Sequence, residues 1–99
     1  MATFTQVGQQ TLTVSTTSIG LTIPTGIYPS HAIIQVTTAN VRWRADETDP
    51  TTSAGIIVAA GSNIEWTDPL INYEGLIRNV EFIRDDSVDA VLEIAYFSA

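Results

Sequence analysis

Apolar residues alternate with polar ones along most of the chain, and this period of two constrains the fold more than any other feature. Successive side chains of a β-strand point to opposite faces, so alternation is typical of strands with one buried face. The clearest run places Val88, Ala90, Leu92, Ile94 and Tyr96 on one face. No stretch sustains the helical period, and the chain is therefore expected to be all-β.

Turn-forming residues divide the chain into about eight short strands. We expect strands near residues 4–7, 11–15, 19–23, 32–38 running on into 41–44, 56–58, 63–66, 76–83 and 88–96. Short strands at this spacing predict an antiparallel β-sandwich or a jelly-roll-like barrel. Residues 1–99 should form a single domain, because two cores built from 99 residues would each be too small to be stable.

The charge of the chain is strongly acidic and unevenly placed. Eleven Asp and Glu face four Arg and no Lys, giving a net charge of −7, and no charged residue precedes Arg42. Such a surface repels nucleic-acid phosphates and anionic lipid heads, so we expect no nucleic acid and no membrane as partner. The lack of Lys suits a surface that contacts other protein, or the acids simply provide solubility; the composition leaves both readings open.

Neither the start of the chain nor its longest apolar run predicts targeting to a membrane. The start, MATFTQVGQQ, lacks the basic and apolar parts of a signal peptide, and the longest apolar run, Gly55–Gly61, is too short to span a bilayer. A soluble protein made in the cytoplasm is expected. Since no cysteine is present, oligomerisation is the expected source of additional stability.

Few residues in the sequence are candidates for catalysis or for metal binding. His31 is the only histidine and stands beside a turn, where a structural role is favoured over a catalytic one. Without Cys or a second His, neither a transition-metal site nor a nucleophile–base pair is expected, and we predict no enzyme and no cofactor.

Two acidic clusters provide the remaining polar chemistry. They are Asp46, Glu47 and Asp49 in one loop, and Asp85, Asp86 and Asp89 in another. Closely spaced carboxylates can bind Ca²⁺, but neither cluster has the spacing of a known calcium loop. Solvated acidic turns are the favoured interpretation, with calcium binding as the alternative.

Three aromatic residues, Trp43, Trp66 and Tyr73, could form a platform for a sugar ring. Large aromatic side chains in a small β domain more often lie in the core, because each buries about 150–250 Å². Core packing is therefore favoured, and a carbohydrate-binding module stays as an alternative.

Arg42 and Arg44 are two residues apart on an expected strand, so both point to the face opposite Trp43. Acceptors could come from the following loop, from a neighbouring strand, or from the acidic loop of a second copy. Because Arg and Trp are enriched at interface centres, we treat a set of residues as a candidate subunit interface. These are Arg42, Arg44, Asp46, Glu47 and Asp49, together with Phe97, which lies on the nominally outer face of the last strand.

The second half of the chain combines several of these features in one order. An Arg-aromatic-Arg strand at 42–44 leads into an acidic Pro-Thr loop at 46–51, followed by Gly55, an Ala60-Gly61 turn and a final pair of strands. Over residues 39–97 this pattern resembles small β-sandwich virion proteins of tailed bacteriophages. The chain departs from that pattern by inserting residues 68–74 between two strands.

The resemblance implies a structural virion protein, with a capsid cement or decoration protein as the favoured kind. It implies the major capsid protein as partner, a homo-oligomer with a trimer favoured, and a place on the capsid exterior. A tail or neck component, or a carbohydrate-binding module of a host-recognition protein, is the alternative.

Overall fold

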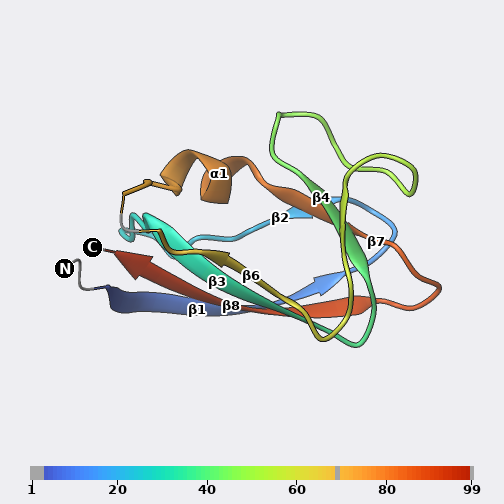
Figure 1. Ribbon diagram of the computed structural model, residues 1–99, viewed down its shortest axis with the longest axis horizontal. Helices are drawn as coiled ribbons and strands as arrows, with labels where there is room; N and C mark the ends of the chain where they lie inside the picture. Colours follow the sequence, from blue (N-terminus) through green and yellow to red (C-terminus); the bar gives the residue numbers. More distant parts are fainter. Residues whose placement is uncertain (1–3, 69, 99) are drawn as a thin grey trace.

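Two antiparallel sheets pack face to face in the structure, a computed structural model that describes residues 4–68 and 70–98 (Figure 1). The strands are β1 (Thr5–Val14), β2 (Ile19–Gly20), β3 (His31–Thr37), β4 (Val41–Arg44), β5 (Ile56–Val58), β6 (Asn63–Trp66), β7 (Glu81–Arg84) and β8 (Ala90–Ser98), with one helix, α1 (Glu74–Asn79). The first sheet has the order β1-β8-β3-β6 and the second the order β2-β7-β4-β5. The predicted β-sandwich of about eight strands is confirmed.

The strand order follows from one long hairpin that has been rolled up. β1 pairs with β8, β2 with β7, β3 with β6 and β4 with β5, so the chain pairs its first half with its second throughout. The added pairs β3–β8 and β4–β7 then close the ribbon into two sheets. This is the strand order of a jelly roll.

The core lies between the sheets and is supplied by alternate residues of the long strands. Its fully buried aliphatic side chains include Val14, Ile34, Val36, Val41, Leu92 and Ile94. Tyr96 is also fully buried, and its hydroxyl donates a 2.7 Å hydrogen bond to Oε1 of Gln10. Burial raises the pKa of Tyr96 to about 12.

One predicted strand, residues 76–83, is wrong in its first half. Glu74–Asn79 forms α1, and only Glu81–Arg84 is a strand. The apolar residues Tyr73, Leu76, Ile77 and Val80 recur at intervals of three and four, which puts them on one side of a helical turn. Burial of Ile77 and Val80 against the core stabilises this turn and overrides the short alternation that favoured a strand.

The N-terminal strands also differ from the prediction. The two strands expected at 4–7 and 11–15 are one strand, β1, with a bulge between Gln6 and Gly8. Continuous pairing with the nine-residue β8 carries β1 through the polar residues that interrupt its apolar pattern. Of the strand expected at 19–23, only Ile19–Gly20 pairs, and Val88, predicted to face the core, is 50% exposed ahead of β8.

Candidate functional site

The candidate site is the outer surface of β4 and the loop of residues 45–55, which joins β4 to β5 (Figure 1). The loop folds back over the strand, and Pro50 within it is buried. Gly55 makes this close approach possible: it has φ +140°, and a Cβ there would lie 3.2 Å from both the Cβ of Arg42 and the carbonyl oxygen of Trp43. A larger residue at 55 would push the loop off β4.

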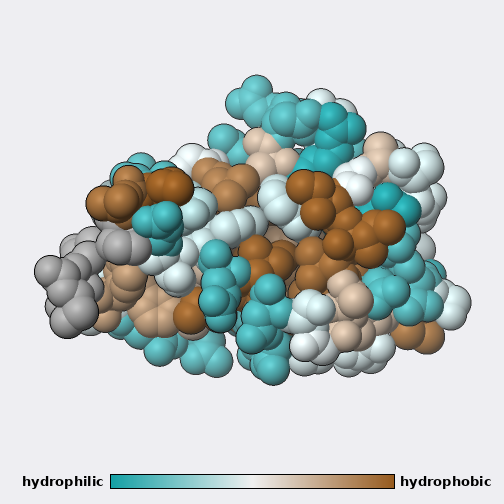
Figure 2. Space-filling view, in the orientation of Figure 1, coloured by the Kyte–Doolittle hydropathy of each residue, from teal (hydrophilic) through white to brown (hydrophobic). Residues whose placement is uncertain are grey.

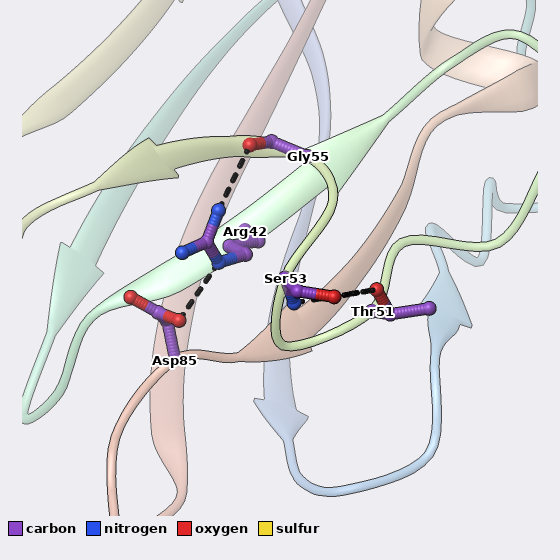
Figure 3. Close-up of polar contacts among 5 residues, drawn as sticks. All are labelled: Arg42, Thr51, Ser53, Gly55 and Asp85. Carbon is purple, nitrogen blue, oxygen red and sulfur yellow. Dashed lines mark hydrogen bonds and ion pairs between the residues drawn. The ribbon is translucent and has the colours of Figure 1, made fainter.

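Arg42 holds the end of the loop to the sheet. Its Nε donates a 2.8 Å hydrogen bond to Oδ1 of Asp85, and its Nη1 donates a 3.2 Å bond to the carbonyl of Gly55 (Figure 3). Both side chains of the ion pair are only about one-fifth exposed, at 18% and 20%. Arg42 thus takes its partner from the residue that directly follows the neighbouring strand β7, and not from its own loop or, in this structure, from a second copy. The same view shows the turn of the loop, where Ser53 contacts the hydroxyl of Thr51.

Arg44 finds its partner in its own loop. Both side-chain oxygens of Asp46 accept from the guanidinium, with 3.0 Å between Nε and Oδ1. Hydrogen bonding to Arg44 lowers the pKa of Asp46, and the same bond raises the pKa of Arg44. Because the pair is exposed to solvent, it orders the start of the loop and contributes little to global stability.

A carboxyl pair that the sequence analysis did not single out lies beside Arg44. Glu81 on β7 is the residue opposite Arg44 in the β4–β7 ladder. Burial, then hydrogen bonding and charge repulsion with Asp49, raise the pKa of Glu81, while Ser18 opposes the shift. Because Asp49 lies beside Glu81, the acidic loop crosses the outer face of the second sheet. Because the neighbouring Phe82 is buried, alternation places Glu81 on the outer face, but only the folded loop brings Asp49 to it.

A hollow of about 370 Å³ opens where the loop meets the edge of the sandwich. Its lining residues are Trp43, Arg44, Ala45, Asp46, Gly55 and Ile56. Ile56 and Ile57 of the adjoining edge strand β5 are 57% and 51% exposed. Figure 2 shows a hydrophobic area over this strand. The hollow therefore combines an apolar wall with a charged rim formed by one Arg and one Asp.

The three candidate platform residues do come together, but mainly inside the protein. The rings of Trp43 and Trp66 meet edge to face with centroids 5.5 Å apart, and Tyr73 stacks on Trp66 at 6.4 Å. Trp66 is only 7% exposed and belongs to the core. Trp43 alone among the three lines the hollow. The three rings therefore pack mainly in the core, and only the ring of Trp43 can be reached from the hollow.

His31 is a buried structural residue, 3% exposed. Its Nε2 lies 3.1 Å from the carbonyl oxygen of Asp68 and 3.0 Å from that of Ile71, while Nδ1 lies 2.7 Å from the hydroxyl of Ser30. Because carbonyl oxygens can only accept, Nε2 is the donor to both of them, and Nδ1 is bonded to the hydroxyl of Ser30. The ring thereby fixes the segment that precedes α1.

The structure separates the predicted interface residues into two places. Arg42, Arg44, Asp46, Glu47 and Asp49 belong to β4 and its loop, where Glu47 is exposed with φ 64°. Phe97 lies on the other sheet, half-buried and in register with His31 and Gln6. The contact of these six residues with another subunit stays a prediction.

The arginines of the chain are all engaged internally. Arg42 pairs with Asp85, Arg44 with Asp46, Arg78 with Glu74 and Arg84 with Asp89. Eleven acids less these four leave seven without an Arg partner. Within the part of the chain that the structure describes, no group of three or more His, Cys, Asp and Glu side chains is placed to hold a metal ion.

The fold and the site together define a small acidic jelly-roll sandwich with an arginine-anchored loop. No protein-family model, curated protein or solved structure matches the chain. None of the helices in the described residues is long and apolar enough to cross a membrane.

Proposed function

We propose that the protein is a structural virion protein of a tailed bacteriophage, most specifically a capsid cement or decoration protein that binds the outer shell without catalysis. The observation that carries the proposal is the surface beside β5. Exposed Ile56 and Ile57 adjoin a hollow rimmed by Arg44 and Asp46, an arrangement of apolar contact area and polar rim that protein interfaces use.

The distribution of charge supports a protein partner over a nucleic acid. Each arginine is already paired with a carboxylate of the same chain, so the surface presents seven unpaired acids and no cluster of free cations among the described residues. Phosphate backbones are repelled by such a surface. A capsid protein can instead meet it through the uncharged and apolar areas.

The fold class agrees with a role on a particle. Jelly rolls are common in viral capsid domains and also in lectins, so the strand order supports the lead and leaves a sugar-binding alternative. The resemblance of residues 39–97 to phage virion proteins favours the first. Repetition of many weak contacts on a shell would give binding through avidity.

Co-sedimentation with purified shells of the encoding phage tests the proposal. Wild-type protein should pellet with shells, and the shells should withstand a higher temperature when it is bound. Ile57→Asp should abolish pelleting, whereas Val88→Asp, at an equally exposed aliphatic residue away from the hollow, should pellet normally. Failure to bind any shell would overturn the capsid role, and binding to isolated tails instead would replace it with a tail or neck role.

A carbohydrate-binding module is the second candidate, because Trp43 lines the hollow together with Arg44 and Asp46. A sugar stacked there should protect the fluorescence of Trp43 from a soluble quencher. Trp43→Phe should remove the effect, while the buried Trp66 should be unaffected by sugar. Absence of protection by host-surface glycans would exclude this candidate.

A further inference from the structure

The four edge strands of the sandwich differ greatly in length. β2, β5 and β6 have two, three and four residues, whereas β1 has ten. β1 forms the outer edge of its sheet beside β8. Proteins commonly shorten, charge or interrupt exposed edges to prevent pairing with another chain. β2, β5 and β6 follow that rule because they are short, whereas β1 is long.

β1 also lacks most other features that protect an edge. Its sequence, TQVGQQTLTV, contains no charged residue and no Pro. Its single bulge lies between Gln6 and Gly8, and from Gly8 to Val14 the strand pairs with β8 residue for residue. Seven regular residues remain, longer than the average strand of a globular protein.

Outside its ladder with β8, the backbone of β1 forms one hydrogen bond within the described part of the chain, a 3.5 Å bond from Nε2 of Gln6 to the carbonyl of Gly8. Apart from its ladder with β8, no backbone–backbone bond involves residues 5–14. Pro24 and Ile27 pack near Gly8, and the amide of Thr22 donates to the side chain of Gln10, but neither contact pairs the outer edge. Alternate N–H and C=O groups therefore face outward, ready to form a further ladder.

Electrostatics favours a second copy of the chain at this edge. Two molecules of charge −7 repel each other, so contact costs least where the surface carries no charge. The nearest acid is Glu93 on β8, which accepts a 2.9 Å hydrogen bond from Thr11. Across a β8-β1-β1-β8 junction, three strand spacings put the two Glu93 backbones about 14 Å apart, and each carboxylate is engaged by Thr11 of its own chain.

We infer that two copies associate by antiparallel pairing of β1 with β1, which joins their first sheets into one continuous eight-stranded sheet. The exposed side chains near the junction are Gln9, Thr11 and Thr13. Such cross-strand Thr and Gln contacts are compatible with a twofold axis, and Thr–Thr pairs stabilise antiparallel strands. The inference stands apart from the capsid role, since it concerns how copies meet rather than what they bind.

Native mass and cysteine cross-linking test the pairing. Wild-type protein should have the mass of two copies, or of an even number, whereas the trimer implied by the resemblance requires a different interface. The chain has no cysteine, so Gln9→Cys, Thr11→Cys and Thr13→Cys each introduce one thiol. An axis at Thr11 links that variant to itself on oxidation. An axis one residue earlier links it to Gln9→Cys, and one residue later to Thr13→Cys.

Matched variants in the exposed loop provide the controls. Thr52→Cys should stay unlinked under the same oxidation. Thr13→Glu should convert the dimer to monomer by placing like charges across the junction, while Thr52→Glu, with the same change in charge, should leave it intact. A monomeric or trimeric wild type, or a dimer in which none of the β1 cysteines cross-links, would overturn the inference. Shell binding by a monomer would leave the proposed function standing while removing the pairing.

Discussion

The two sheets of the sandwich are stabilised by different kinds of interaction. The first has strands of ten, nine, seven and four residues that pair over long registers and bury one face completely. The second has strands of at most four residues, and its outer face is covered by the loop of residues 45–55 and crossed by ion pairs. The first sheet is therefore stabilised by apolar burial. The second depends additionally on polar contacts that can be removed one at a time.

The largest expected difference is between core and edge isoleucines. Ile94→Ala in β8 removes a fully buried side chain and should cost about 2–5 kcal/mol of the free energy of unfolding. Ile57→Ala in β5, at a residue 51% exposed, should cost less than about 0.5 kcal/mol. Urea unfolding followed by circular dichroism measures both. Equal losses would contradict the view that the core between the sheets, and not the exposed edge strand β5, provides the apolar stabilisation.

A smaller difference in stability is expected between variants of the two arginine ion pairs of β4. Asp85→Ala leaves the partly buried Arg42 without its carboxylate and should cost about 1–2 kcal/mol. Asp46→Ala breaks the exposed pair with Arg44 and should leave the melting temperature unchanged. Hydrogen exchange should show that the first variant frees the amides of residues 50–55. Equal melting temperatures for the two variants would mean that Arg42 does not anchor the loop.

The smallest effect concerns the pH dependence of the loop. The pKa of Glu81 is raised in the folded protein, so the folded state holds the proton more tightly than the unfolded state. This contribution to stability is present below the unfolded pKa and is lost as pH rises through the folded one. Glu81→Gln should remove that loss and raise the melting temperature near pH 7 slightly. Asp46 has a lowered pKa and acts in the opposite sense, since its stabilisation is lost as pH falls.

Melting curves of wild type and Glu81→Gln at several pH values between 4 and 8 would measure this effect. Asp89→Asn provides a control, because it also removes one charge but lies away from Asp49 and pairs with Arg84. If Glu81→Gln and wild type keep the same pH profile, the carboxyl pair does not strain the loop.

Local sequence determined the fold class, most of the strands and most of the core. Residues 90–96 alternate so regularly that burial of Leu92, Ile94 and Tyr96 could be predicted from the period alone. The direction of Arg42 and Arg44, away from the core, followed from the same rule. The structural role of His31 was expected on another ground, because it is the only histidine and stands beside a turn. α1 escaped prediction because the helical spacing of its few apolar residues overlaps the alternation that runs on into β7.

Only the tertiary structure determined which residues far apart in the sequence contact one another. Asp85 is 43 residues from Arg42, and Asp49 meets Glu81 only because the loop closes on Gly55. Alternation assigns a face to each side chain, but it carries no information on which strands become neighbours. The jelly-roll order supplies that information, because it brings β7 beside β4 and leaves the uncharged β1 as a long edge. The sequence by itself thus determined which surfaces are apolar or charged, and the packing of the sheets decided which of them stay open to another chain.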